Sequence, residues 1–297
     1  MALSAAAAQT AAAAPEQMSA SVRRYVMCPP TYFAVTYRIN PWMDPREAVD
    51  NRRAQRQWGR LHQTLVALGH DIELLTPQPD LPDMVFAANA GIIVGGRAMV
   101  PRFRHRERRA ESAHYARAFA ALGIAEIQQA EHVNEGEGDF RLVGERLLAG
   151  TGPRSDPASA REVSEYFGLP TVAFTLIDPR LYHLDTALAV IDERTIAYYP
   201  PAFDTASRGM LHDLHPDAIV ADAEDAQSLA LNLISDGHTV LMAPGHDRLA
   251  HALAERGLRV LPVDTAELRK AGGGAKCCVL ERHLRSSPAG DARSREQ

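Results

Sequence analysis

The chain has 297 residues, of which 46% are hydrophobic and 23% are charged, and its formal net charge is −5 at pH 7. This composition is ordinary for a globular protein, and no stretch approaches the roughly 18 consecutive apolar residues of a membrane span. The basic run at residues 102–109 (RFRHRERR) contains Glu107 and only Phe103 as an aromatic residue. Such a run favours a solvated surface over a nucleic-acid site. We therefore expect neither a membrane nor a nucleic-acid partner.

The three cysteines, Cys28, Cys277 and Cys278, include two sequence neighbours. Such a set does not build a disulfide framework and favours a reducing compartment, so we expect a cytoplasmic protein. Adjacent cysteines also lack the C-x₂₋₄-C spacing with which two sulfurs share one zinc ion. The sequence thus predicts no metal and no other cofactor.

The two ends of the chain differ in composition from its middle. Residues 1–22 are Ala-rich without the basic start of a secretory signal, and residues 286–297 are polar with Pro and Gly. Both compositions are typical of disorder. No linker-like stretch rich in Pro, Gly and Ser interrupts residues 23–285, which predicts a single domain there.

Short apolar segments alternate with amphipathic ones along this domain. Strands are predicted at 25–27, 71–75, 91–94, 98–100, 147–149, 171–176, 187–191, 195–199, 218–220, 239–242 and 259–262. Helices are predicted at 46–67, 108–122, 158–167, 222–232 and 246–255. The third helix is well delimited, because Asp156 can cap it, Pro157 suits its first turn and Gly168 suits its exit. The recurring pattern is expected if one supersecondary unit is used repeatedly around a centre.

Four segments along the chain carry residues with chemical potential, and the first is the least distinctive. Residues 82–91 (PDMVFAANAG) predict, by themselves, an ordinary turn that leads into a strand.

The second segment, residues 134–139 (NEGEGD), holds three carboxylates separated by glycines. It could be an acidic surface turn, and its spacing does not match a calcium loop, which needs a longer ligand series. A planar cationic substrate would need such carboxylates.

The third segment, residues 181–186 (LYHLDT), brings a histidine close to a carboxylate. Alternation along an extended chain would place His183 and Asp185 on the same side, with Leu184 opposite. The alternative is a structural histidine near the start of a strand.

The fourth segment is a glycine run, residues 272–274, followed by Ala275, Lys276 and Cys277. Glycines let the chain turn sharply and let a ligand approach the backbone, so a cysteine placed here can be exposed and reactive. Lys276 is expected to favour the thiolate. The alternative is a turn that leads Cys278 into a buried strand.

Together, FAAN, EGEGD, HLD and GGGAKC resemble, in this order, the guanidino-group modifying superfamily of dimethylarginine dimethylaminohydrolases, arginine deiminases, arginine dihydrolases and amidinotransferases. The resemblance spans about residues 23–285. It implies an α/β fold, a pseudo-fivefold α/β propeller of repeated ββαβ modules, with the site on the central axis. It also implies a small guanidino substrate as the partner, and it leaves a homo-oligomer open.

Carried over by position, the resemblance assigns the catalytic roles. Cys277 would be the nucleophile, His183 the general acid and base, and Glu135 the catalytic carboxylate. Asp185 would hold the guanidinium beside the nucleophile. Because EGEGD is one residue longer than the family's EGGD, Glu137 remains an alternative to Glu135.

The resemblance also proposes ligands for the rest of the substrate. Arg154 in GTGPR lies where family members present an arginine to the substrate α-carboxylate, and Arg108 would be a second anchor. Asn40 belongs to the INPWM segment, which looks like the arginine dihydrolase branch. Asn89 replaces the carboxylate that is usual in deiminases and methylarginine hydrolases. An amide both accepts and donates, so it would tolerate a citrulline-like intermediate for a second round.

The implied activity is cysteine-dependent hydrolysis of the guanidino group of L-arginine or an N-methylated arginine through a covalent thiouronium. The product would be citrulline or, after a second round, ornithine. Two alternatives remain: an amidinotransferase that passes the amidino group to an amine, and a catalytically silent arginine-binding relative.

Overall fold

The computed structural model describes residues 22–284, which form a mixed α/β structure. The extension and the tail expected at the two ends of the chain lie outside the described residues, apart from Val22. Within residues 22–284, no helix is long and apolar enough to cross a membrane.

The strands of the described region form five units of three, in which an antiparallel pair is followed by a parallel pair. The units are β15 (Leu280–His283), β1 (Arg24–Met27) and β2 (Asp71–Leu74); β3 (Ile92–Val94), β4 (Arg97–Val100) and β5 (Glu126–Gln129); β6 (Phe140–Val143), β7 (Arg146–Thr151) and β8 (Thr171–Thr175); β9 (Leu188–Val190), β10 (Ile196–Tyr198) and β11 (Ile219–Val220); β12 (Ile234–Ser235), β13 (Thr239–Met242) and β14 (Arg259–Pro262).

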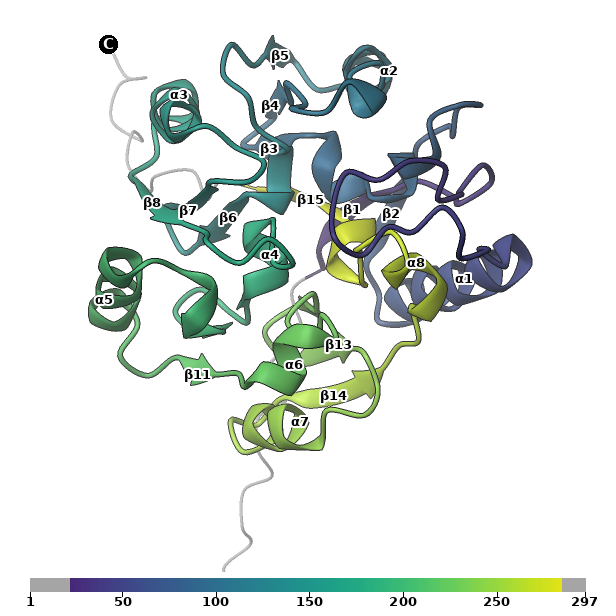
Figure 1. Ribbon diagram of the computed structural model, residues 1–297. Coiled ribbons are helices and arrows are strands. Elements are labelled where there is room, and N and C mark those ends of the chain that lie inside the picture. The colour runs from purple at the N-terminus through teal and green to yellow at the C-terminus, as the bar shows by residue number, and fades with distance from the viewer. Residues whose placement is uncertain (1–21, 285–297) are drawn as a thin grey trace, which may run out of the picture.

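A helix connects the second and third strands of each unit, as the parallel pairing requires. These helices are α1 (Asn51–Ala67), α2 (Glu111–Ala121), α3 (Pro157–Phe167), α5 (Thr205–Leu214) and α7 (Asp247–Ala254). In Figure 1 they lie at the outside of the molecule, and the sheets lie inside them. Three shorter helices, α4 (Leu184–Ala187), α6 (Ala223–Gln227) and α8 (Ala266–Arg269), lie nearer the middle.

The last strand joins the two ends of the described chain. β15 pairs antiparallel with β1 and parallel with β3, which merges the first two units into one six-stranded sheet. The segment that precedes β15 is therefore carried to the middle of the molecule.

The core lies between each helix and its sheet. Tyr115 and Phe119 of α2, for example, are fully buried against Ile93, Ala98 and Val100 of β3 and β4. Burial of one such aromatic side chain contributes roughly 1.5–3 kcal/mol. Because every unit buries its own helix, the sheets are held as a rigid frame for the residues at their inner ends.

The predicted elements agree with most of the structure, with three corrections. The predicted helix 222–232 ends at Gln227, because Leu229 adopts a left-handed conformation with φ of 59° that interrupts it. α5, β5, β6, β12 and β15 were not predicted; β12 has only two residues, too few for a periodic pattern. Asp156 occupies the N-cap of α3, but its side chain accepts from Arg104 instead of from the helix, at 2.6 Å. Gly168 ends this helix with a φ of +63°, as expected.

Candidate active site

The first strands of the five units, β3, β6, β9, β12 and β15, are called the inner strands. Five connections meet at one end of them, and each connection directly precedes one inner strand. Four of them are the 3₁₀ turns η2 (Ala87–Ala90), η4 (Gly136–Gly138) and η6 (Lys276–Cys278) and the single-turn helix α4, which lead into β3, β6, β15 and β9. The fifth contains Asn232, two residues before β12. The four segments selected from the sequence are thus the same connection in four different units. This placement explains why residues so distant in sequence come together.

Cys277 is buried at this meeting point, with 3% of its surface exposed. Its Sγ lies 3.4 Å from Asp185 Oδ2, and Asn232 Nδ2 donates to the same sulfur over 3.1 Å. Asn232 Oδ1 accepts the backbone N–H groups of Cys277 and Gly274, each at 3.0 Å. One amide therefore fixes both the nucleophile loop and the thiol.

Burial, followed by the Asp185 carboxylate, raises the pKa of the Cys277 thiol well above its usual range. The expectation that Lys276 favours the thiolate is wrong in this structure. Lys276 Nζ donates instead to Glu137 over 2.8 Å and to the Val279 carbonyl over 2.6 Å. The 3₁₀ turn sends neighbouring side chains in different directions, and Cys278 Sγ accordingly points to the Gly274 carbonyl at 3.4 Å.

His183 and Glu135 form a buried pair beside the cysteine. His183 Nε2 lies 2.8 Å from Glu135 Oε2, and Arg154 Nη1 donates to that same oxygen over 2.6 Å. Burial alone would raise the pKa of Glu135, but Arg154 and His183 hold it well below its usual range. Glu135 is therefore ionised and can keep the imidazole in one orientation.

Asp139 adds a second carboxylate to this pair. Its Oδ2 accepts from the Ser155 hydroxyl at 2.6 Å and lies 3.9 Å from His183 Nε2. Burial raises the pKa of Asp139 to about 6, although His183 and Ser155 lower it in part.

The sequence pattern predicted that His183 and Asp185 lie on one extended strand, and this prediction is wrong. Residues 184–187 form a helical turn, because Leu184 N and Thr186 N are bound by Asp139 and by the His183 carbonyl. Both side chains nevertheless reach the site: His183 contacts Glu135, and Asp185 contacts Cys277.

The alternative carboxylate, Glu137, lies in a different environment from Glu135. It binds Lys276 at 2.8 Å, and its other oxygen lies 2.5 Å from His283 Nε2. Both carboxylates are fully buried, but among the two only Glu135 contacts His183. The intervening Gly136 has a φ of +63°, and a Cβ there would lie 2.6 Å from the Gly91 carbonyl oxygen. The extra residue of the loop is thus accommodated by a glycine turn.

Asn89 joins this acidic loop to a second buried network. Its Nδ2 donates to the Glu135 carbonyl over 2.8 Å, and its Oδ1 accepts from Arg108 Nη1 over 2.8 Å. A Cβ at Gly138 would overlap Asn89 Nδ2, so this position requires glycine. The amide is therefore held in a defined orientation at the edge of the site.

Arg108 and Arg154 both have carboxylate partners already. Arg108 donates from Nε and Nη2 to the two oxygens of Glu111, at 2.9 and 2.8 Å, and is only 2% exposed. This corrects the expectation of a solvated surface for the whole basic run. Arg154 binds Glu135 and the Ile39 carbonyl, and its guanidinium lies 4.5 Å from the ring centre of Tyr182. Neither arginine projects freely into solvent.

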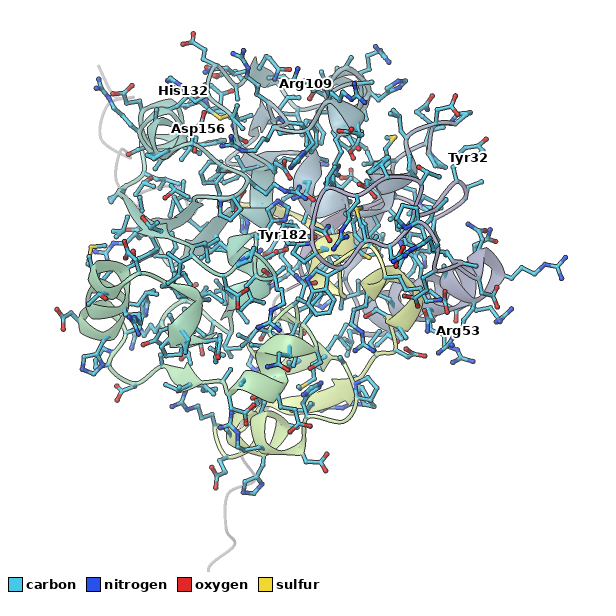
Figure 2. The ribbon with its side chains drawn as sticks, in the orientation of Figure 1. Tyr32, Arg53, Arg109, His132, Asp156 and Tyr182 are labelled. Carbon is cyan, nitrogen blue, oxygen red and sulfur yellow. The ribbon has the colours of Figure 1, made fainter. Side chains whose placement is uncertain are left out.

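Asn40 lies on the long connection between β1 and α1 and ties it to the nucleophile loop. Its Nδ2 donates to the Ala271 carbonyl over 3.0 Å, and its Oδ1 accepts from Trp42 N and Met43 N. Tyr182 also holds this loop, because its hydroxyl donates to the Gly272 carbonyl over 2.9 Å. Figure 2 shows Tyr182 near the middle of the molecule, away from the labelled residues at its periphery.

Several buried polar atoms of the site have no partner among the described residues: Asp83 Oδ1, Glu135 Oε1, Asp185 Oδ1 and His183 Nδ1. Three of these four are carboxylate oxygens, which only accept hydrogen bonds when ionised. Buried polar groups normally have partners. The arrangement therefore fits a ligand that carries several N–H donors and a positive charge.

Two residues of the candidate active site, Asn232 and Asp83, were not predicted from the sequence. Asn232 lies in an unremarkable apolar segment (LNLIS), and its role becomes visible only because it occupies the same position in its unit as the other site residues. Asp83 belongs to a selected segment, but its carboxylate is buried against Tyr37, whose hydroxyl donates to it over 2.9 Å.

A family model described as N,N dimethylarginine dimethylhydrolase, eukaryotic, matches residues 34–284. The chain belongs to this family. The N(G),N(G)-dimethylarginine dimethylaminohydrolase of Mycobacterium tuberculosis is 49% identical to it over 269 residues, which cover 91% of this chain and 89% of that protein. The resemblance to guanidino-group modifying enzymes is thereby confirmed.

A second group of relatives is named for a different activity. The bifunctional arginine dihydrolase/ornithine cyclodeaminase ArgZ of Synechocystis is 35% identical over 263 residues, which cover 86% of this chain but only 37% of ArgZ. The crystal structure of the N-terminal domain of ArgZ, a cysteine-to-serine mutant bound to substrate, superimposes with a TM-score of 0.84, covering 88% of this chain and 98% of that domain at 34% identity.

Proposed function

We propose that this protein hydrolyses the guanidino group of L-arginine or an N-methylated arginine through a covalent thiouronium on Cys277. It is a hydrolase that acts on the C–N bonds of linear amidines, as its family and its relatives' names indicate. The observation that carries the assignment is the position of Cys277 against Asp185, in a buried site whose carboxylate oxygens lack partners among the described residues. The guanidinium supplies the N–H donors and the positive charge that these oxygens lack.

The first half-reaction begins with the thiol, which is protonated in the free protein because burial and Asp185 raise its pKa. A guanidinium bound to Asp185 would neutralise this carboxylate and add a positive charge, so the thiol would lose its proton more easily and pass it to neutral His183. The thiolate then forms a C–S bond to the guanidinium carbon. His183 donates a proton to the departing nitrogen, the C–N bond breaks, and ammonia or an amine leaves.

The second half-reaction uses the same histidine in the opposite sense. Neutral His183 accepts a proton from water, the resulting hydroxide adds to the thiouronium carbon, and the C–S bond breaks. The hydroxyl proton of the intermediate passes to the sulfur, so the ureido product and the thiol are released, and His183 returns its proton to solvent. Glu135 holds His183 through Nε2, and Nδ1 is without a partner among the described residues, so Nδ1 is the nitrogen free to exchange the proton. Asn232 Nδ2 would stabilise the thiolate in both steps.

The rest of the substrate would be held at the side of Arg154. Arginine is suited to a carboxylate by its planar pair of donors. We favour Arg154 over Arg108 because Arg154 binds Glu135 directly. Arg108 would act mainly by orienting Asn89. The unpaired Asp83 oxygen would accept from the substrate α-ammonium group. Asn40 would tie the connection between β1 and α1 to the nucleophile loop.

The number of hydrolysis rounds that each bound substrate undergoes depends on Asn89. Its amide can accept from a guanidinium N–H or donate to a ureido oxygen, whereas an ionised carboxylate can only accept. Retention of the ureido product for a second attack would give ornithine, as the name of the cyanobacterial arginine dihydrolase suggests by analogy. The more similar mycobacterial relative is named for dimethylarginine instead.

We further infer that the five sheet units are the blades of a pseudo-fivefold α/β propeller with the site on its axis. Their common strand order, with a helix before each third strand, supports this arrangement. The three cysteines are free and buried, which is consistent with a cytoplasmic location.

Product analysis tests the function directly. The purified protein is incubated with L-arginine, monomethylarginine or dimethylarginine, and ammonia, methylamines, citrulline and ornithine are resolved. We expect one guanidino substrate to be consumed by the wild type and none by Cys277→Ser. An amidino product that forms only when an amine acceptor is added would indicate the amidinotransferase. Binding of arginine without turnover would indicate the silent relative and refute the hydrolase.

A further inference from the structure

A second pocket lies at the opposite end of the same inner strands. The candidate active site precedes the first strand of each unit, whereas this far pocket is lined by residues within or just after those strands: Val94, Arg141, Leu142, Val190, Ile191, Ser235, Arg282 and His283. Its volume is about 850 Å³. The far pocket is therefore separate from the candidate active site, with the inner strands between them.

Buried donors without partners gather at the far pocket. Arg23 and Arg141 both line it, and the Nε atom of each is buried without a hydrogen-bond partner among the described residues. Guanidinium N–H groups can only donate. The candidate active site leaves carboxylate oxygens unpaired, so the two ends of the strands call for ligands of opposite charge.

The cations beneath the far pocket differ in how closely they are paired. Arg23 and Glu281 form a close pair at 2.6 Å, and Lys276 binds Glu137 at 2.8 Å. Arg141, by contrast, has no hydrogen-bond partner among the described residues: its Nη1 lies 3.8 Å from Glu137, a carboxylate already shared with Lys276 and His283, and it interacts with Asp185 only electrostatically.

Arg141 is therefore the residue most in need of an anion. It is only 8% exposed, its Nε has no hydrogen-bond partner within residues 22–284, and its ion pair with Glu137 is longer than a hydrogen bond. A buried guanidinium without hydrogen-bonded partners is costly, and a bound carboxylate or phosphate would satisfy it with charge-assisted bonds.

The rim of the far pocket limits the kind of anion. Glu145, Glu193 and Arg24 line it and are exposed, whereas Arg23 and Arg141 lie deeper. The two acidic side chains outnumber the one exposed arginine at the opening and disfavour a polyanion such as nucleic acid, but a small anion can pass between them and reach the floor.

We propose that the far pocket is a binding site for a small carboxylate or phosphate anion, held by Arg141 and Arg23. The site is independent of the guanidino chemistry at the other end of the strands. Its ligand would complete the buried network that runs through Glu137 to Lys276, the neighbour of Cys277.

Isothermal titration of the full chain with sodium phosphate and, separately, with sodium acetate tests the proposal, at constant sodium chloride. We expect saturable binding of at least one of the two anions, and the anion that binds identifies the ligand class. Arg141→Met should weaken this binding at least tenfold. Arg161→Gln, which removes an exposed arginine on α3, should leave it unchanged. Circular dichroism verifies that each variant is folded.

Two further measurements keep the test decisive. Arg23→Met removes the second guanidinium that lines the far pocket, and it serves if Arg141→Met does not fold; it should weaken binding severalfold. Saturating the Cys277→Ser variant with L-arginine should not displace the anion. Absence of saturable heat with either anion, equal affinity in the Arg141 and Arg161 variants, or displacement by L-arginine would each overturn the proposal.

Discussion

Asn232 offers the sharpest test of how the nucleophile is held. Its side chain donates to Cys277 Sγ and to the Asp185 carbonyl, and it accepts from the N–H groups of Cys277 and Gly274. Asn232→Ala removes all four contacts, whereas Asn232→Asp retains both acceptor contacts and loses both donor contacts, to the sulfur and to the Asp185 carbonyl. The two variants therefore separate support of the loop from stabilisation of the thiolate.

The magnitudes follow from these contacts. Asn232→Ala leaves two buried N–H donors unpaired, which should cost about 2–6 kcal/mol of folding free energy at ~1–3 kcal/mol for each donor. Asn232→Asp keeps those donors satisfied and should cost less stability. It loses the N–H at the developing thiolate, for which a decrease in kcat of roughly 10²–10³-fold is expected. Its carboxylate, replacing a donor 3.1 Å from Sγ, should also raise the pKa of the thiol.

Urea denaturation measures the stability of both variants, and steady-state kinetics with the substrate identified by product analysis gives kcat and KM. The pH dependence of thiolate absorbance near 240 nm reports the Cys277 pKa, with Cys277→Ser as the blank. A wild-type kcat in Asn232→Asp, or an unshifted thiol titration, would refute the role of Asn232 at the sulfur. A stability loss in Asn232→Ala without any loss of kcat would reduce Asn232 to a structural residue.

Three further predictions concern neighbouring groups. Cys277→Ser should abolish turnover and Cys278→Ser should retain most of it, measured as initial rates; equal losses would undermine the nucleophile assignment. Glu135→Gln should lower kcat by about 10²–10⁴-fold, because the general acid and base, His183, loses its orienting carboxylate. Glu137→Gln should chiefly lower the free energy of unfolding, by about 3–5 kcal/mol, since it breaks a buried ion pair. Urea denaturation and kinetics on both variants distinguish these outcomes. Burial raises the pKa of Asp139 to about 6, so the contribution of its protonated form to folding stability is complete below the unfolded-state pKa near 4 and is lost as pH rises through 6. Urea denaturation from pH 4 to 7 should show the stability of Asp139→Asn rising by up to about 3 kcal/mol relative to that of the wild type. A stability difference that does not change with pH would contradict the shifted pKa.

Much of the fold could be predicted because local patterns decide local structure. α3 is delimited by Pro157 and by Gly168, whose left-handed conformation few other residues adopt. α6 was predicted too long, because the φ of 59° at Leu229 is imposed by its tertiary surroundings and leaves no mark in an apolar helical pattern. β12 was missed because two residues carry no periodicity.

The candidate site shows the same division. The loop glycines and the chemistry of Cys277, His183 and Glu135 were visible in the sequence, but their partners were not. Lys276 follows the glycine run and suggested a cation beside the thiol, whereas the 3₁₀ turn directs it to Glu137. Several hydrogen-bond partners in this site are far apart in sequence: 45 residues separate Asn232 from Cys277, and 139 separate Glu137 from Lys276.

The sequence by itself determined the types of reactive group, the order of the units and the conformations that only glycine allows, because these depend on each residue and its near neighbours. The tertiary structure alone decided which carboxylate holds His183, that Asn232 holds Cys277, and that the unpaired carboxylate oxygens of the candidate active site and the unpaired Nε atoms of Arg23 and Arg141 lie at opposite ends of the inner strands. Such choices arise when connections from separate units meet in a buried space, where distance, desolvation and pairing set the energy of every charged group.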